Sequence, residues 1–175
     1  EELWQNYEYF LKAVLPYAER YGVRLALHPD DPPLPKLGDT SRILTSAGAF
    51  RKAMGLVPSP NLGITFCQAN FVLMGEDLEI LIPEWKEKIF YVHFRNVEGT
   101  VTDYHETFHD NGAIDMARTL RLYVENGIDV PIRVDHVPEY PSGDQAPVAG
   151  YGAIGRLFAI GYLKGLLEAI EHDTN

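Results

Sequence analysis

Four residues that can bind a divalent metal each end a short apolar segment of this sequence. Imidazole, thiolate and carboxylate groups are all ligands of divalent metals. If the segments are parallel β-strands, their carboxyl ends meet at one edge of a sheet, so that one donor per strand converges on a point. The pattern therefore predicts a metal site. The predicted ligands are His28, Cys67, His93 and Asp135.

Each of these residues also has an ordinary structural interpretation. A lone histidine at the end of a strand is commonly a surface or hydrogen-bonded residue, and a lone cysteine commonly packs as a small hydrophobe. An aspartate at a strand end often caps the next helix. The coincidence of all four at equivalent positions favours the metal site. A thiolate favours zinc or iron and a carboxylate favours manganese or magnesium, so the pattern alone leaves the metal open.

Two arginines flank the predicted ligands. Arg95 lies two residues after His93, and Arg133 lies two residues before Asp135. Residues two apart in a strand share a face, so each arginine could lie on the ligand side of its strand. A guanidinium can hold a carboxylate through two parallel hydrogen bonds. Both arginines are therefore candidates for binding an anionic substrate, with a structural ion pair as the alternative.

Groups that can transfer protons lie close by in the sequence. The segment 104–110 contains His105 and His109, which could contact a substrate, and a solvated loop is the alternative interpretation. His136 directly follows Asp135, so it can serve the same site only if the strand has already ended. Tyr151 lies between two glycines at the start of the last expected helix, where its phenol would be well exposed.

Hydrophobic periodicity predicts the elements that must position these residues. Strands alternate with amphipathic helices, an order typical of an α/β fold with a parallel sheet and right-handed crossovers. The first strand is expected to be buried, the segments 34–45 and 95–114 to be connections, and Ile154, Leu157, Phe158 and Leu166 to be core residues. We expect strands at 23–27, 61–67, 89–94 and 131–136, and helices at 3–21, 46–56, 76–88, 115–126 and 150–170.

Composition limits the classes of partner. The 175 residues are 46% hydrophobic and carry a formal charge of −10, which fits a single domain over 1–175. The sequence has no basic run, so neither nucleic acid nor an anionic membrane surface is an expected partner. The single cysteine, Cys67, allows no disulfide within the chain and fits a reducing compartment. With no apolar run of membrane-spanning length and no signal-peptide pattern at the start, we expect a cytoplasmic protein.

With these residues in view, the chain resembles mannonate dehydratases, of the xylose-isomerase-like barrel superfamily. Six blocks in the same order, spread over nearly the whole chain, carry the resemblance. The sequence departs from the family pattern at Val134 and Val137, where proline and glycine are expected, and at Ala113, where aspartate is usual. The blocks are His28-Pro29-Asp30-Asp31-Pro32-Pro33, Phe66-Cys67, His93-Phe94-Arg95, the segment from His105-Glu106 to Asp115-Met116, Arg133-x-Asp135-His136 and Gly150-Tyr151-x-Ala153-Ile154-Gly155-Arg156-Leu157.

The resemblance implies a lyase that converts D-mannonate to 2-keto-3-deoxy-D-gluconate and water with a divalent metal, Mn²⁺ or Fe²⁺, with Zn²⁺ as the alternative. It implies that His136 and Tyr151 form the proton-transfer pair, and it leaves open which of them is the acid. The implied metal ligands are His28, Cys67, His93 and Asp135, and the expected substrate-binding residues are Arg95, Arg133, His105 and His109.

Chain length sets a further expectation. A complete (β/α)₈ TIM barrel needs about 250 residues, whereas this sequence has four strand–helix units that resemble the carboxyl-terminal half of the family. We therefore expect a half barrel. Its open sheet edges would favour pairing with a second copy in a homo-oligomer or with a missing amino-terminal half. Two alternatives to the dehydratase are a sugar isomerase or epimerase of the same superfamily and a non-catalytic half-barrel remnant.

Overall fold

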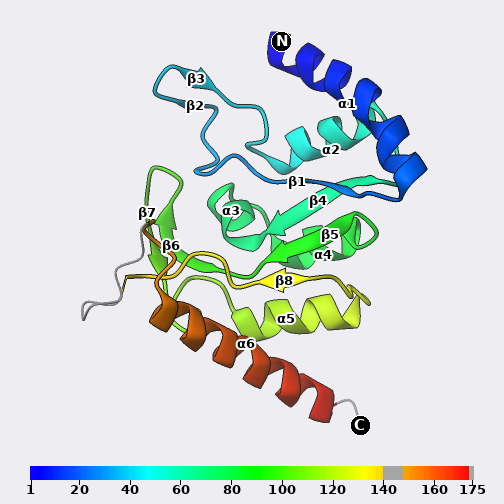
Figure 1. Cartoon of the computed structure of the whole chain (residues 1–175). Coiled ribbons are helices and arrows are strands. Elements are labelled where there is room, and N and C mark those ends of the chain that lie inside the picture. The colour runs from blue at the N-terminus through cyan, green and yellow to red at the C-terminus, as the bar shows by residue number, and fades with distance from the viewer. Residues whose placement is uncertain (140–147, 174–175) are drawn as a thin grey trace.

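A four-stranded parallel sheet organises the protein. In the computed structural model, which describes residues 1–139 and 148–173, the strands lie in the order β1-β4-β5-β8 (Figure 1). Every neighbouring pair is parallel, so all four carboxyl ends lie at one edge of the sheet. The predicted α/β fold with a parallel sheet is confirmed. The strands are β1 (Leu25–Leu27), β4 (Leu62–Cys67), β5 (Ile89–His93) and β8 (Ile132–Arg133).

The helices begin and end where local sequence requires it. Gly22 ends the first helix in the left-handed conformation, at a φ of 65°, which glycine adopts without steric cost. Ser46, Asp77 and Asp115 each accept a backbone amide at the start of the following helix. The helices are α1 (Glu2–Tyr21), α2 (Ala47–Leu56), α3 (Gln68–Leu73), α4 (Leu78–Trp85), α5 (Met116–Glu125) and α6 (Ala153–Asp173).

Two segments that were predicted as connections contain antiparallel hairpins. The first hairpin pairs β2 (Lys36–Leu37) with β3 (Thr40–Ser41). The second pairs β6 (Asn96–Thr100) with β7 (Asp103–Thr107) and stands beyond the carboxyl end of β5 (Figure 1). The polar composition of these segments concealed them, because neither hairpin has the apolar alternation of a half-buried strand.

Other expectations about burial were wrong for a common reason. Ala26 in β1 is exposed, because β1 is an edge strand with β4 as its one neighbour in the described chain. In α6, Leu157 is 70% exposed and Phe158 is 42% exposed, so the predicted core positions of this helix lie largely at the surface. Ile154 is 46% exposed. Apolar periodicity identifies a face that can be buried, but only an opposing element buries it.

An aromatic cluster packs on one face of the central strands. Phe66 of β4 stacks on Phe71, with ring centroids 4.7 Å apart, and Phe71 meets Trp85 edge to face at 5.4 Å. Phe50 of α2 closes the cluster against Phe71 at 5.2 Å. Burying each such side chain stabilises the fold by about 1.5–3 kcal/mol. This core fixes the central strands and therefore the two residues, Cys67 and His93, that end them.

None of the helices in the described part of the chain combines the length and hydropathy needed to cross a membrane.

Candidate metal centre

Three of the four predicted ligands meet at the carboxyl edge of the sheet. One ligand atom each from His28, Cys67 and His93 can be chosen so that all three lie within 4.8 Å of one another. Nε2 of His28 is 3.1 Å from Nδ1 of His93. Donors bound to one ion at roughly 2.0–2.3 Å lie roughly 3–4.5 Å apart. The cluster therefore has nearly the dimensions of a metal site, and its nitrogen and sulfur donors suit a transition metal.

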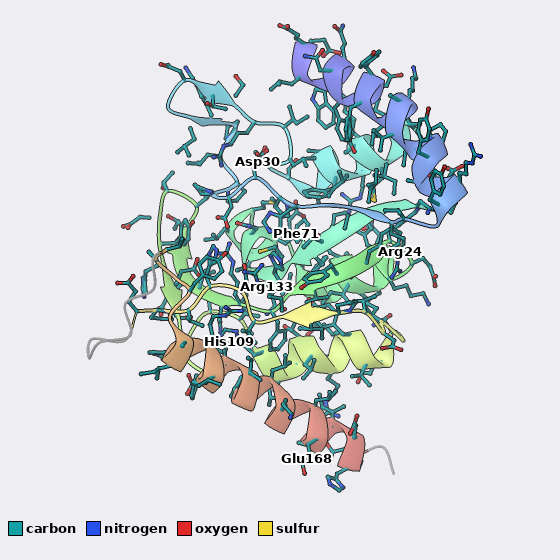
Figure 2. All side chains as sticks on the ribbon, in the orientation of Figure 1. Arg24, Asp30, Phe71, His109, Arg133 and Glu168 are labelled. Carbon is teal, nitrogen blue, oxygen red and sulfur yellow. The ribbon has the colours of Figure 1, made fainter. Side chains whose placement is uncertain are left out.

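Strand register explains why these residues meet. Cys67 and His93 are paired positions at the ends of the neighbouring strands β4 and β5. His28 follows β1 directly, and Asp30 then folds the chain back, because its Oδ2 accepts the backbone amides of Ile43 at 3.1 Å and Leu44 at 2.8 Å. Figure 2 labels Asp30 in this connection above the sheet. The Asp30 carboxylate thus ties the loop after β1 to the residues that precede α2.

Asp135 reaches the same cluster through a backbone reversal. β8 ends at Arg133, and Asp135 adopts a φ of 59°, the one positive φ at a non-glycine residue in the described chain. Such a conformation costs of order 1–3 kcal/mol and is concentrated at functional sites. Oδ2 of Asp135 lies 3.3 Å from Nδ1 of His93. The strand has therefore ended before Asp135, which meets the condition under which Asp135 and His136 can serve one site.

Charges in the cluster reinforce one another. Burial alone would raise the pKa of Asp135, but the hydrogen bond from His93 and the charges of His93, His136 and Arg95 lower it to about 2. Burial alone would lower the pKa of His93, and its hydrogen bonds to Asp135 and Cys67 raise it instead. The lowered pKa of Asp135 favours its negative form, and the raised pKa of His93 favours its positive form. A bound cation would take the place of the imidazolium proton beside Asp135 and Cys67.

The side chain of Arg95 is completely buried beside the cluster. Its NH2 group donates to Asp31 at 2.7 Å, and its NH1 group donates to Glu106 and to Nδ1 of His136, the latter at 2.8 Å. Burial would lower the pKa of Arg95, but the charges of Cys67, Glu106 and Asp31 raise it above its ordinary value. Arg95, predicted to bind substrate, therefore has its terminal nitrogens engaged by protein groups in this structure.

The β6–β7 hairpin supplies two residues of the 104–110 segment that the sequence analysis did not select as site residues. In a strand, alternate residues share a face, and Tyr104 and Glu106 both point to the Arg95 network, with the Tyr104 hydroxyl 3.3 Å from Asp31. His105, between them, is exposed, opposite Glu98 of β6. Recognition of the hairpin would have selected Glu106 in place of His105, because the alternation follows from the strand.

His109 occupies an interior position. Its ring is completely buried, and Nε2 donates to the backbone carbonyl of Val134 at 3.0 Å. Figure 2 labels it beside the amino-terminal end of α6. His109 thus joins the connection after β7 to the segment that carries Asp135. Neither His105 nor His109 belongs to the metal-ligand cluster of His28, Cys67 and His93.

His136 and Tyr151 form a direct pair. Nε2 of His136 lies 2.9 Å from the Tyr151 hydroxyl, and the rings meet edge to face with centroids 5.1 Å apart. Gly150 precedes Tyr151 with a φ of 86°, a conformation that favours glycine, and a β-carbon there would make an ordinary 3.5 Å contact with the His136 side chain. The guanidinium of Arg133 lies 5.2 Å from the Tyr151 ring centroid. Arg133 is partly exposed and is thus accessible beside the pair.

The departures from the family pattern near this pair are accommodated by packing. Val134 and Val137 are both buried against Ala159 of α6. Val137 has no positive φ, so the absence of glycine there causes no backbone strain. Its amide donates to the carbonyl of Gly150 at 3.0 Å, which ties the segment after Asp135 to the start of α6. The two valines therefore support the loop that carries Asp135 and His136.

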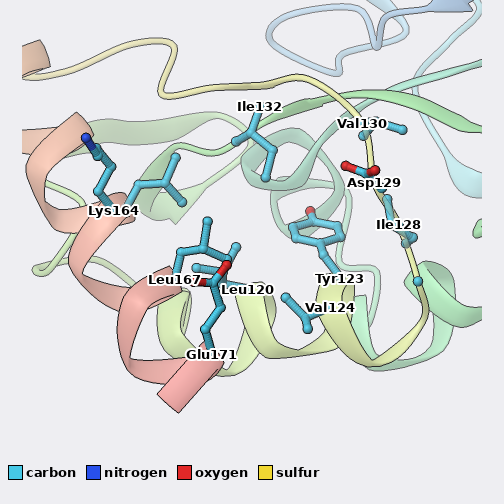
Figure 3. A pocket seen from close by; sticks show the side chains of 12 residues that line it. Leu120, Tyr123, Val124, Ile128, Asp129, Val130, Ile132, Lys164, Leu167 and Glu171 are labelled. Atoms are coloured by element: carbon cyan, nitrogen blue, oxygen red, sulfur yellow. The ribbon is translucent and has the colours of Figure 1, made fainter. Parts of the chain in front are cut away.

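A cavity lies elsewhere, away from the metal-ligand cluster. It has a volume of about 510 Å³ and opens between α5, α6 and the amino end of β8 (Figure 3). Leu120, Tyr123, Ile132 and Leu167 line it. Because the metal-ligand cluster lies at the carboxyl ends of the strands, this apolar cavity is separate from the candidate site.

Comparison with known proteins gives one consistent result. A family model described as D-mannonate dehydratase (UxuA) matches residues 1–175. A mannonate dehydratase of Streptococcus equi subsp. zooepidemicus is 37% identical over 174 residues, which cover 97% of this chain and 47% of that protein. One of Brachyspira hyodysenteriae is 35% identical over 175 residues, 98% of this chain and 48% of that protein. The chain thus spans about half the length of the curated relatives it matches.

Solved structures agree with the fold. The crystal structure of mannonate dehydratase from Streptococcus suis serotype 2 superposes on all of this chain and on 51% of its own, with a TM-score of 0.91 at 34% identity. A D-tagatose 3-epimerase-like protein superposes on all of this chain and 61% of its own, with a TM-score of 0.71 at 19% identity. A xylose isomerase domain protein from Alicyclobacillus acidocaldarius gives 0.70 at 18% identity, covering 98% of this chain and 61% of that one. The last two likenesses show a shared fold alone.

Proposed function

The chain belongs to the D-mannonate dehydratase family, and we propose that the protein containing it converts D-mannonate to 2-keto-3-deoxy-D-gluconate and water. The observation that carries this proposal is the cluster of His28, Cys67 and His93 at the strand ends, with Asp135 in contact with it. The cluster lies within a chain that matches the family from its first residue to its last. Likeness to the epimerase-like and isomerase domain structures concerns the fold and gives no separate support for their reactions.

The proposed fold is half of a (β/α)₈ barrel. In support, the relatives are about twice as long, and the matching crystal structure is covered to 51%. β1 and β8 each have a free edge in the described chain. A parallel barrel closes when every strand has two neighbours, so a second set of strands is needed. We propose that this set comes from an amino-terminal half or from a second copy of the chain, and that residues 1–175 are one domain.

A divalent metal, Mn²⁺ or Fe²⁺ with Zn²⁺ as the alternative, fits the donor set of the cluster. The residues that would hold it are His28, Cys67, His93 and Asp135. When bound, such an ion supplies Lewis-acid stabilisation of negative charge on substrate oxygens. Asn70 supports this set, because its Nδ2 donates to the Cys67 sulfur at 3.3 Å. Partners of this kind orient metal ligands and tune their affinity.

Proton transfer is assigned to His136 and Tyr151, the pair joined by a 2.9 Å contact beside Asp135. Dehydration removes the C2 proton and protonates the leaving C3 hydroxyl, and groups at hydrogen-bond distance from the substrate carry out both transfers. Arg133 is the proposed substrate-binding arginine, because it is partly exposed and lies beside Tyr151. Arg95, by contrast, is buried and hydrogen-bonded to Asp31, Glu106 and His136, so its proposed role is to support the site.

The test uses the full-length protein loaded with Mn²⁺ and supplied with D-mannonate. The proposal is supported if the parent releases a 2-keto-3-deoxy acid and Tyr151→Phe does not. The variant His105→Gln, at an exposed residue, should keep the activity. Mass spectrometry separates this product from an epimer or a keto sugar, which would keep the oxygen. If the protein releases no 2-keto-3-deoxy acid from D-mannonate or from any other hexonate, the proposed function is rejected.

A further inference from the structure

A second guanidinium, which the sequence analysis did not select as a site residue, lies beside Tyr151. The Cζ atom of Arg156 is 5.9 Å from the centroid of the Tyr151 ring, and the Cζ atom of Arg133 is 5.2 Å from it. At both distances a cation is attracted to the face of an aromatic ring. Arg133 comes from β8 and Arg156 from the first turn of α6. Two separate elements therefore place positive charge at the proposed proton-transfer tyrosine.

Close packing of α6 on the segment after β8 places Arg156 at the site. A β-carbon at Gly155 would lie 2.9 Å from the Val137 side chain and 3.2 Å from the Pro138 carbonyl oxygen, so the absence of a side chain allows this approach. The Arg156 amide donates to the carbonyl of Gly152 at 3.1 Å, at the start of the helix. Arg156 is therefore carried by a helix that is packed against the site.

The carboxylates at this edge of the sheet do not neutralise Arg156. Asp31 and Glu106 pair with the buried Arg95, and Asp135 is in contact with the metal-ligand cluster. None of the ion pairs found among the described residues includes Arg156, and its Nε atom is buried without a hydrogen-bond partner. A guanidinium has donors only, and a donor without an acceptor costs free energy. An anion is therefore the expected partner of Arg156.

We propose that Arg156 is a substrate-binding residue that, together with Arg133, holds the carboxylate of a sugar acid beside Tyr151. This assignment rests on the proposed function and adds a residue to it, and it leaves proton transfer with His136 and Tyr151. Both arginine side chains are partly exposed, so a substrate can reach them. A guanidinium presents two parallel N–H groups, which match the two oxygens of a carboxylate.

The two arginines would select for negative charge in the substrate. Two guanidinium groups near one ring repel each other, and a neutral sugar supplies no charge to offset that repulsion. A carboxylate bound by both groups offsets it and accepts charge-assisted hydrogen bonds, which are stronger than those of a neutral hydroxyl. The arrangement therefore favours a sugar acid over the neutral sugars on which a sugar isomerase or epimerase acts.

Binding of two unreactive analogues tests the assignment. The 3-deoxy analogue of D-mannonate keeps the carboxylate but has no C3 hydroxyl to lose, and the amide of this analogue is neutral. Isothermal titration calorimetry is done on the full-length protein loaded with Mn²⁺. The parent should bind the acid more tightly than the amide. Arg156→Gln should bind the acid about 10–100-fold more weakly, the loss expected for charge-assisted hydrogen bonds, and should bind the amide as the parent does.

Lys164→Gln is the matched control, because it removes the same charge from the same helix at a residue that lines the separate cavity. It should bind both analogues as the parent does. If Arg156→Gln binds the acid as tightly as the parent, or if Lys164→Gln weakens it equally, Arg156 has no specific role in binding the substrate.

Steady-state kinetics separates substrate binding from simple packing against Tyr151. Arg156→Gln should raise the KM for D-mannonate with little change in kcat, as expected when binding is lost equally from the ground state and the transition state. Arg156→Lys keeps the charge but not the planar set of donors, so it should recover part of the affinity. A lower kcat at unchanged KM would instead assign Arg156 to positioning Tyr151 and would overturn the inference.

A chemical test requires no variant and so does not depend on the folding of one. Phenylglyoxal modifies accessible guanidinium groups, and mass spectrometry of peptides from the full-length parent locates each modified arginine. The 3-deoxy acid should protect Arg156 and Arg133, and the amide should not. Equal modification of Arg156 with and without the acid, or no reaction at this residue, would show that the substrate does not reach it.

The outcomes also distinguish this inference from the proposed function. A protein that dehydrates no hexonate, but in which the 3-deoxy acid protects Arg156, loses the proposed function and keeps the anion site. A protein that dehydrates D-mannonate with the same KM in Arg156→Gln keeps the proposed function and loses the inference.

Discussion

Cys67 and His93 are paired residues at the ends of two neighbouring parallel strands. Their side chains lie on the same side of the sheet, because residues in register on adjacent strands point to the same face. The pair therefore requires no special loop, and the packing of β4 against β5 determines its geometry. His28 and Asp135 join it from the ends of the outer strands by turns of their own.

Replacement of a strand-end ligand should remove metal binding. The full-length parent should contain about one divalent ion per chain, as expected for one site, and His93→Ala should contain nearly none. His105→Ala is the matched control, because His105 is exposed and lies outside the cluster. Elemental analysis of protein purified without chelator measures both. Equal metal content in the two variants would contradict the site.

Asp135 should show a conformational effect apart from its charge. Alanine must adopt the left-handed conformation at this position, where φ is 59°, so Asp135→Ala should lower the free energy of unfolding by about 1–2 kcal/mol relative to Asp135→Gly. Asp135→Asn should fold well, since asparagine tolerates this region, and should bind metal more weakly. Denaturant unfolding followed by metal titration tests the pair. If the alanine and glycine variants are equally stable, the strain is absent.

Asp30 should stabilise the loop that carries His28. Its carboxylate accepts two backbone amides, from Ile43 and Leu44, and bonds of this charged kind contribute roughly 1.5–3 kcal/mol each. Asp30→Ala should therefore lower both the free energy of unfolding and the metal content. Asp39→Ala is the control in the same connection. The Asp39 side chain is fully exposed, and its carboxylate forms a long, 3.8 Å surface ion pair with Lys36. Similar stability of the two variants would refute this role.

His109 should make stability depend on pH. Burial lowers the pKa of His109 below its ordinary value of 6.5, so the folded protein holds this ring neutral. Above pH 6.5 both states are neutral and this contribution is fully present. As pH falls below 6.5 the unfolded chain takes up the proton first, so the free energy of unfolding decreases until the lower folded pKa is reached.

The variant His109→Gln should lack this dependence. An amide keeps a donor for the Val134 carbonyl, and it does not titrate in this range. Denaturant unfolding of parent and variant at pH 8.0, 6.5 and about 5 gives the difference curve. The parent should lose stability relative to the variant only on the acid side. A difference that is constant with pH would mean that His109 is not held neutral.

The chain by itself should associate through its uncovered elements. β1 and β8 are edge strands, and Leu157 on α6 is 70% exposed. Static light scattering should give a mass above that of one chain, and Leu157→Glu should shift the distribution toward monomer. Glu168→Gln, an exposed polar change on the same helix (Figure 2), should not. A single monomeric species for the unmodified chain would contradict the prediction.

Sequence alone determined the parallel α/β fold and the positions of the central strands, since apolar segments alternate with amphipathic helices. It also identified His28, Cys67, His93 and Asp135 as a set, because the ends of parallel strands share an edge whatever the details of packing. It could not decide whether His136 faces the same site. That depended on the left-handed backbone at Asp135, which no local propensity of the sequence specifies.

Only the tertiary structure decided which polar residues support the cluster. The sequence offered His105 and His109, whereas the hairpin turned Glu106 inward and left His105 exposed, and the connection after β7 buried His109. It also decided that Arg95 is enclosed by Asp31, Glu106 and His136 and does not face open space. The physical reason is that strand ends follow from local periodicity, while the partners of a buried charge come from segments distant in the chain, which only packing brings together.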